Sequence, residues 1–333
     1  MKGLVTVFGG SGFVGAQVVR ALAKAGWRIR VAVRNPGRGY RLPMLGDVGQ
    51  IEIVQANIRD RPSIERALDG ATACVNAVGI LYESGRQSFA AIHHQGAADI
   101  AEAAANGGVR RFIQISALGA SLDSASAYAV GKAAGEVAVR ENLPSAVILR
   151  PSVVFGPDDA FFNRFAALAT LSPALPLFGG GGTKLQPVYV GDVALAVVRA
   201  LEDEEAGGKD YELGGPKVYT LRELMELTLR TIGRRRWLAP IPFAIARPLG
   251  AVGDILARFT PFAPPITSDQ LALLGADNIV GPAGLGLAAL GIVPTAAEPI
   301  LPTYLYRYRR GGQYADLAGA APAVLAGRAT AAQ

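Results

Sequence analysis

The chain is poor in the residues that build disulfide frameworks and metal centres. It has one cysteine and two histidines among 333 residues. Cys74 lies in the apolar run TACVNAVGI, so we expect a small buried core residue, and a disulfide framework is excluded. His93 and His94 are adjacent, and adjacent residues on a helix do not face one ligand. Because no cysteine or carboxylate cluster accompanies them, we expect no metal site.

Long hydrophobic runs are also missing. No uninterrupted apolar segment approaches the roughly 20 residues that a membrane-spanning helix needs. Glycines interrupt the apolar start MKGLVTVFGG and no small-residue cleavage site follows, so we expect no signal peptide and a cytoplasmic location. Half of the residues are nevertheless hydrophobic, which is enough to bury a large core.

Acidic residues are outnumbered by basic ones. The net charge is +6 and the isoelectric point is near 9.5. Such a balance favours acidic partners, which could be anionic lipid, nucleic acid or an acidic protein face. Of these we expect an anionic membrane surface or a protein, and no nucleic acid.

Short β-branched runs alternate with helical stretches up to about residue 150. The strand-like runs are LVTVFGG, RIRVAVR, IEIVQAN, ACVNAVG, RRFIQIS and SAVILRP, and helical patterns such as AQVVRALAKAG and GAADIAEAAANGG lie between them. Strands that alternate with helices of this length form βαβ units on a parallel sheet. The fold class is therefore α/β, with a doubly wound parallel sheet of the Rossmann type over residues 1–150.

The composition changes after residue 150, where prolines multiply. Helical patterns at VALAVVRALEDEE and LRELMELTLRTIG flank a short strand at DYELGG. We expect a smaller α/β C-terminal lobe over residues 151–315 that partly returns to the Rossmann sheet. The tail over residues 316–333 is rich in alanine and glycine without an apolar period, so we expect it to be disordered.

A glycine-rich turn, FGGSGFVG, follows the first strand and precedes the first helix. Gly9 permits the tight turn, Gly12 lets the backbone approach a pyrophosphate, and Gly15 lets the helix pack closely on the sheet. Free N–H groups and the helix dipole then favour an anion. Because the turn lies in the first βα unit, it predicts a dinucleotide site.

The end of the second strand predicts which dinucleotide is bound. NAD-binding proteins typically place an acidic residue there to bond the ribose 2′-hydroxyl, whereas this chain has Arg34. An arginine can pair with a 2′-phosphate through two hydrogen bonds, and Arg38 could help. We therefore expect NADP(H), bound as NADPH; the alternative is that Arg34 is a solvated surface residue.

Further motifs carry a family resemblance. Together with Gly9, Gly12 and Gly15, the segments YAVGK, LRPSVVFGP and QPVYVGDVA resemble the extended or atypical short-chain dehydrogenase/reductase superfamily. Three others, FGPDDAFFNRFA, YELGGPKVYTLRELMELTLRTIGRRR and PPITSDQLALLGADNIV, resemble the NADP(H)-binding accessory subunits of respiratory complex I, the alpha-subcomplex subunit 9 family, and their bacterial relatives. The resemblance covers most of the chain.

The resemblance implies a set of cofactor contacts. Relatives usually carry aspartate where this chain has Asn57. The resemblance places Ser11, Phe13 and Val14 under the pyrophosphate, and Asn57 and Ile58 beside the adenine. It places Ala77, Val78 and Gly79 beside the ribose, and Pro151, Ser152 and Val153 near the nicotinamide.

The resemblance also implies a catalytic tyrosine and lysine. Tyr128 and Lys132 are four residues apart, so on a helix they share one face and could hold one ribose. A nearby cation is expected to lower the pKa of the tyrosine toward working pH. The candidate for the carbonyl-orienting hydroxyl is Ser116, but Ala117 follows it where active relatives commonly carry a hydroxyl. Three other serines lie closer to Tyr128 in the sequence: Ser121, Ser124 and Ser126. We expect Tyr128 and Lys132 to clamp the ribose without turnover.

A basic and apolar stretch, GRRRWLAPIPFAIARPLGAVGDILARF, follows in the second lobe. Its prolines, at 240, 242 and 248, are expected to interrupt any long helix. Arg247 and Asp254 would be costly in the hydrocarbon layer, so we expect that this stretch does not span a membrane. The cluster Arg234, Arg235 and Arg236 is expected to attach the protein to an anionic membrane surface. The segment YLYRYRRGG is either a second contact, with a partner protein, or a segment whose tyrosines pack inside the lobe.

These patterns predict an NADP(H)-binding accessory subunit of respiratory complex I, peripheral on the cytoplasmic face of the inner membrane. Complex I subunits are then its protein partners. Two alternatives stay open: an active NADP-dependent reductase or epimerase, which Ala117 disfavours, and a cytosolic NADP(H)-sensing regulator, which the pair Tyr128 and Lys132 disfavours.

Overall fold

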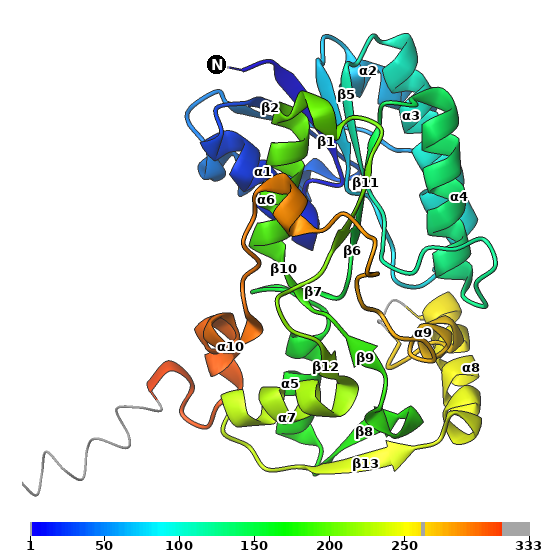
Figure 1. Ribbon diagram of the computed structural model, residues 1–333, viewed down its shortest axis with the longest axis vertical. Helices are drawn as coiled ribbons and strands as arrows, with labels where there is room; N and C mark the ends of the chain where they lie inside the picture. The colour runs from blue at the N-terminus through cyan, green and yellow to red at the C-terminus, as the bar shows by residue number, and fades with distance from the viewer. Residues whose placement is uncertain (1, 261–263, 315–333) are drawn as a thin grey trace, which may run out of the picture.

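The computed structural model describes residues 2–260 and 264–314. Its main feature is a seven-stranded sheet in which every strand is parallel to its neighbours, in the order β11-β6-β5-β4-β1-β2-β3 (Figure 1). The strands are β1 (Leu4–Phe8), β2 (Arg28–Val33), β3 (Ile51–Gln55), β4 (Ala73–Asn76), β5 (Arg111–Ile115), β6 (Val147–Pro151) and β11 (Asp210–Leu213). The predicted doubly wound α/β fold class is confirmed.

Helices cover both faces of the sheet. Helices α1 (Phe13–Lys24) and α6 (Val190–Glu202) pack on one face, while α2 (Arg61–Leu68), α3 (Gly96–Asn106) and α4 (Ala127–Asn142) pack on the other. Because successive strand residues point to opposite faces, Val5 and Val7 join the core beneath α1 and α6, whereas Phe8 joins the core beneath α2 and α3. Cys74 is fully buried in that second core, as predicted, and burial raises the pKa of its thiol.

Short strands and helices form the second, smaller lobe at the bottom of Figure 1. Three strand pairs organise it: β8 (Ala174–Phe178) with β13 (Trp237–Ile241), β7 (Val154–Phe155) with β10 (Val188–Tyr189), and β9 (Lys184–Leu185) with β12 (Tyr219–Thr220). The helices are α5 (Phe162–Leu171), α7 (Leu221–Thr231), α8 (Phe243–Phe259), α9 (Ser268–Leu273), α10 (Ala297–Ile300) and α11 (Pro302–Leu305).

The chain crosses between the two parts more than once. Helix α6 packs against α1, and β11 adds the outermost strand of the main sheet beside β6. The Asp192 carboxylate, in the first turn of α6, accepts hydrogen bonds from the backbone N–H of Thr295 (2.7 Å) and from its hydroxyl (2.9 Å). The segment that leads to α10 is thereby held against the main domain. The tail 316–333, expected to be disordered, lies outside the described residues.

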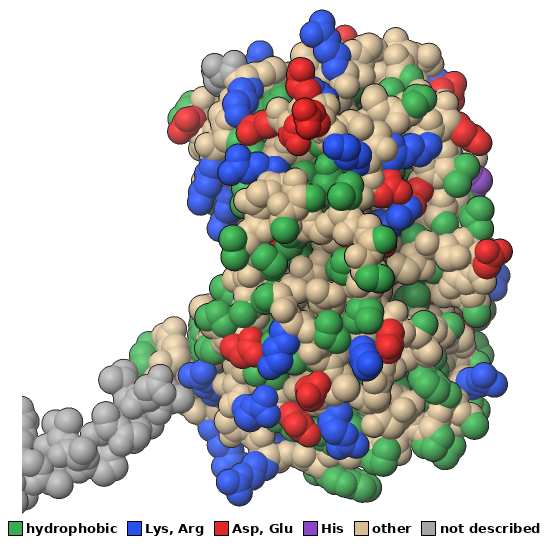
Figure 2. All heavy atoms as spheres, viewed as in Figure 1, with side chains coloured by type: hydrophobic (Ala, Val, Ile, Leu, Met, Phe, Trp, Pro, Cys, Tyr) green, Lys and Arg blue, Asp and Glu red, His purple; other side chains and the backbone are tan. Residues whose placement is uncertain are grey.

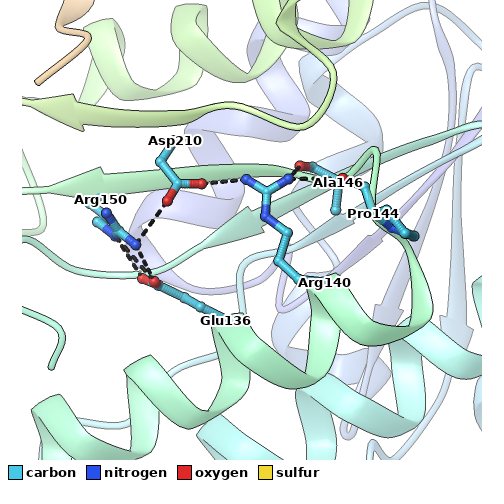
Figure 3. A network of polar contacts seen from close by, with 6 residues as sticks. All are labelled: Glu136, Arg140, Pro144, Ala146, Arg150 and Asp210. Carbon is cyan, nitrogen blue, oxygen red and sulfur yellow. Dashed lines mark hydrogen bonds and ion pairs between the residues drawn. The ribbon is translucent and has the colours of Figure 1, made fainter. Parts of the chain in front are cut away.

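A charged network joins α4 to the edge of the sheet (Figure 3). Arg150 on β6 donates to both oxygens of the Glu136 carboxylate on α4, at 3.0 and 2.5 Å, and pairs with Asp210 on β11 at 2.9 Å. Arg140 on α4 donates to the same Asp210 carboxylate. Two arginines and two carboxylates therefore fix the position of α4, the helix that carries Tyr128 and Lys132.

Surface charge is mixed. Figure 2 shows basic and acidic side chains scattered together over both parts of the molecule on this face. The excess positive charge is thus not gathered into one basic field on the face shown.

Candidate functional site

The glycine turn between β1 and α1 is shaped by close backbone contacts. Gly9 has φ of +78°, and a Cβ there would lie 2.9 Å from the backbone of Ala77 and Val78. At Gly15 a Cβ would lie 2.2 Å from the Gly9 carbonyl oxygen. Both positions therefore require glycine, and their packing brings the start of α1 against the ends of β1 and β4.

The amino end of α1 is open to an anion. Gly12 is the N-cap, no side chain caps the helix, and no acidic residue lies in its first turn. A Cβ at Gly12 would meet only the Gly9 carbonyl oxygen, at 3.3 Å, so one side of the turn is free. Ser11 is exposed, and Phe13 and Val14 are half-buried. The amide groups and helix dipole at this point fit a pyrophosphate.

The other predicted cofactor residues follow neighbouring strands at the same edge of the sheet. Arg34 follows β2, residues 57–58 follow β3, residues 77–79 follow β4, and residues 151–153 close β6 and follow it. The strand order changes direction between β1 and β4, which is where doubly wound sheets bind ligands. The fold thus brings together residues that are up to 142 positions apart in the chain, as counted from Ser11 to Val153.

Local contacts restrict how two of these residues could touch a ligand. The Asn57 side-chain oxygen accepts the Arg59 N–H at 3.2 Å, so it already caps its own loop. The Ile58 side chain is buried in the core beside Gly96, where a Cβ would lie 2.6 Å from it. Only the backbone of Ile58 is therefore available to an adenine.

Tyr128 and Lys132 lie on one face of α4, close to the ends of β4 and β5. Lys132 is buried, its Nζ donates to the Ile115 carbonyl at 3.1 Å, and it lies 6.0 Å from the centre of the Tyr128 ring. A Cβ on Gly79 would lie 3.5 Å from the same Nζ. Burial lowers the pKa of Lys132 to about 8, and Glu136 partly opposes this shift.

The expected lowering of the tyrosine pKa is wrong. Burial, and then the negative charge of Asp269, raise the pKa of Tyr128 to about 12. Lys132, whose Nζ lies 6.0 Å from the centre of the Tyr128 ring, does not reverse this shift. Ser116 is buried, and its hydroxyl has no hydrogen-bond partner among the described residues. These side chains form a compact site with a protonated phenol at neutral pH.

Sequence reasoning missed His93 as a member of this site. A π-helical turn, Ala90–Gln95, leads into α3 and places the His93 ring 5.1 Å from the centre of the Tyr128 ring. Its Nε2 accepts the Ile80 N–H at 3.0 Å. Burial, and then the nearby Lys132, lower the pKa of His93 to about 3, so the imidazole is neutral. No sequence signal marks the wider helical turn that aims this side chain at Tyr128.

Two residues of the second lobe were also missed. The Asp269 carboxylate, on α9, accepts hydrogen bonds from the Ser126 hydroxyl (2.9 Å) and the Tyr128 N–H (3.3 Å) at the amino end of α4. Asn278 accepts the Ser152 hydroxyl at 2.6 Å and donates to the Leu118 carbonyl at 2.9 Å. The segment 268–278 therefore connects the lobe to the β5–α4 loop with the amino end of α4, and to the segment after β6.

The basic and apolar stretch departs from expectation in one respect. Pro248 lies inside the 17-residue helix α8, so the prolines do not prevent a long helix. Small residues make the buried face of α8, and at Gly253 a Cβ would lie 1.7 Å from the Ile266 carbonyl oxygen. This close packing holds the helix together although proline removes one of its hydrogen bonds. No helix within residues 2–260 and 264–314 is long and apolar enough to cross a membrane.

The outer face of α8 is unusually apolar. The face opposite the small residues carries large apolar side chains, each more than a third exposed: Ile245, Leu249, Val252, Ile255, Leu256 and Phe259. Within the basic cluster, Arg234 donates to the Tyr308 carbonyl at 3.0 Å and Arg236 to the Ala169 carbonyl at 2.8 Å. Tyr304, the first tyrosine of YLYRYRRGG, is buried and its hydroxyl donates to the Asp159 carboxylate at 2.5 Å. For this tyrosine the structure favours packing inside the lobe over contact with a partner.

Comparison with known proteins agrees with the fold described above. Residues 5–214 match the NAD dependent epimerase/dehydratase family. The triphenylmethane reductase of Citrobacter sp., solved with NADP(H), is 20% identical with a TM-score of 0.70, over 90% of this chain and 99% of that one. At that identity the likeness concerns the fold.

Curated relatives extend the match to both lobes. The NADH dehydrogenase [ubiquinone] 1 alpha subcomplex subunit 9 of Arabidopsis thaliana is 38% identical over 94% of this chain and 80% of its own length. The mouse protein of that name is 33% identical over 89% of this chain and 78% of its own length. A ceramide reductase of Caulobacter vibrioides is 32% identical over 78% of this chain and 80% of its own length. The chain therefore belongs to the NAD dependent epimerase/dehydratase family, and within it to the group that contains the alpha subcomplex subunit 9 proteins.

Proposed function

We propose that this protein is an NADP(H)-binding accessory subunit of respiratory complex I, and that its nucleotide is held rather than turned over. The match to alpha subcomplex subunit 9 proteins along both lobes carries the proposal. A structural role for the nucleotide is supported by the site itself. Ser116 is buried and is followed by Ala117, so neither residue offers an exposed hydroxyl to orient a carbonyl beside Tyr128.

The nucleotide contacts would be those predicted above. The glycine turn and the amino end of α1 would hold the pyrophosphate, and Lys132 with Tyr128 the nicotinamide ribose. The bound nicotinamide would supply hydride chemistry, whereas the chain supplies binding and orientation. Because Arg34 occupies the end of β2, the protein should prefer NADPH to NADH.

The preference for NADPH gives the first prediction. Loss of a charge-assisted contact to the 2′-phosphate should cost about 1.5–3 kcal/mol, roughly ten- to a hundredfold in affinity. Arg34→Ala should therefore lose that much affinity for NADPH and little for NADH in a fluorescence titration. Equal affinities of the wild type for both nucleotides would contradict the proposal.

A second candidate is an active reductase of a lipid carbonyl. It is favoured by the retained pair Tyr128 and Lys132 and by the relative named ceramide reductase. Single-turnover mixing with a long-chain lipid ketone distinguishes the two. Oxidation of bound NADPH that stops in Tyr128→Phe supports the reductase, and retention of bound NADPH supports the accessory subunit.

The outer face of α8 is the proposed attachment surface. Small residues pack this helix on the lobe while its large apolar residues face outward. An exposed apolar face of this kind is expected to be covered by a membrane or a partner protein. Hydrophobic side chains lie along the lower right edge of Figure 2, where Figure 1 places α8. Arg247 and Arg258 are exposed on the same helix. We propose a peripheral position on the anionic cytoplasmic face of the inner membrane, beside complex I.

A further inference from the structure

Two arginines from neighbouring strand ends meet at one small hairpin. Ser84 and Gln87 pair in an antiparallel bridge, each N–H donating to the other's carbonyl at 3.1 and 3.0 Å. Arg34, after β2, donates from Nη1 to the Gln87 side-chain oxygen at 2.6 Å. Arg59, after β3, donates from Nη1 to the carbonyl of Arg86 at 2.9 Å. Because residues 86 and 87 are adjacent, both guanidinium groups reach the same turn.

The contacts that hold these guanidinium groups are neutral. Among the described residues, neither Arg34 nor Arg59 forms an ion pair with a carboxylate. Both are exposed, and so is Arg86 on the hairpin itself. Glu83, the acidic residue that directly precedes the hairpin, accepts the Phe89 N–H at 2.7 Å. The hairpin thus gathers three positive charges at the edge of the sheet where a 2′-phosphate would lie.

We propose that Arg59 is a second specificity-determining residue for the 2′-phosphate of NADP(H). Gln87 then acts as a neutral substitute for that phosphate and keeps the Arg34 side chain extended toward the hairpin. This inference rests on the proposed NADP(H)-binding function. A phosphate oxygen is a stronger acceptor for a guanidinium group than an amide or carbonyl oxygen. The phosphate therefore replaces the Gln87 oxygen at Arg34 and draws Arg59 from the Arg86 carbonyl.

Binding of NADPH and NADH to variants of the full chain tests the proposal. Arg59→Ala weakens NADPH binding roughly ten- to a hundredfold and NADH binding by less than about twofold. Gln87→Glu also weakens NADPH binding, because the new carboxylate pairs with Arg34 and repels the phosphate. Arg20→Ala is the matched control, since Arg20 is an exposed arginine on α1.

The outcomes separate this proposal from the proposed function. A wild type that prefers NADPH, with the same preference in Arg59→Ala, overturns the role of Arg59 and leaves the function standing. Equal loss of NADPH and NADH binding in Arg59→Ala also overturns it, because a 2′-phosphate contact cannot affect NADH. A wild type without any preference overturns both. Thermal unfolding of each variant verifies that the chain is folded during the titration.

Discussion

Single residues of the site are held in protonation states that their surroundings impose. His93 is neutral and Tyr128 protonated at neutral pH, and Lys132 loses its charge near pH 8. Each state has burial as its largest cause. His93 and Tyr128 therefore keep their charge states across neutral pH, which suits a clamp on a bound ribose, whereas Lys132 titrates close to neutral pH.

The shifted pKa of His93 predicts a loss of stability in acid. Between pH 6.5 and about 3 the unfolded chain binds a proton at His93 that the folded chain does not, so stability falls as the pH falls. The slope from this one group is about 1.4 kcal/mol per pH unit. His93→Gln should therefore lose less stability between pH 7 and pH 4 than wild type, as measured by urea unfolding.

The adjacent histidine is the control for that experiment. His94 is exposed, so His94→Gln should follow the wild-type curve. The same pH dependence in all three proteins would show that other groups cause the acid loss.

At the scale of elements, α9 is coupled to α4. The Asp269 carboxylate lies at the amino end of α4, where a negative charge is favourable to the helix dipole. It also helps to keep Tyr128 protonated. A six-residue helix of the second lobe thereby stabilises the helix that carries the candidate site.

Removal of this carboxylate should loosen the first turn of α4. Asp269→Ala should cost about 1–2 kcal/mol of stability, because it leaves the Tyr128 N–H and the Ser126 hydroxyl without their acceptor. Hydrogen exchange at the Tyr128 amide should accelerate, while the Ala129 amide, which donates to Ser126, keeps more of its protection. Asp123→Ala, in the exposed loop before α4, is the matched control. Unchanged exchange at Tyr128 would refute the coupling.

At the scale of the whole molecule, the two lobes divide the proposed work. The sheet and its loops would hold the nucleotide, and the outer face of α8 would attach the lobe to a membrane beside complex I. The connections through Asp269 and Asn278 link these two surfaces.

Attachment through α8 should be separable from nucleotide binding. Replacement of both Ile245 and Val252 by glutamate puts charge on the outer face, since residues seven apart on a helix share a side. The variant should move from the membrane to the soluble fraction and stop co-migrating with complex I, while NADPH affinity stays within about twofold of wild type.

The matched control changes exposed apolar residues elsewhere. Leu171 and Val293 are each 87% exposed and lie outside α8, so their replacement by glutamate should leave attachment unchanged. Equal release of both double variants would argue against a specific role for α8. A wild type that never associates with membranes or complex I would overturn the accessory-subunit proposal itself.

The sequence by itself was sufficient for the doubly wound sheet, the glycine turn and the family. These depend on local patterns: alternating apolar runs specify strands and helices, and Gly9 and Gly15 are required where the backbone approaches within 3 Å. Only the tertiary structure decided which distant residues share the site. His93, Asp269, Asn278 and the hairpin at Gln87 reach it through packing of separate elements, and the raised pKa of Tyr128 follows from that burial. Contacts and burial of this kind depend on how elements pack, which no local period of the sequence encodes.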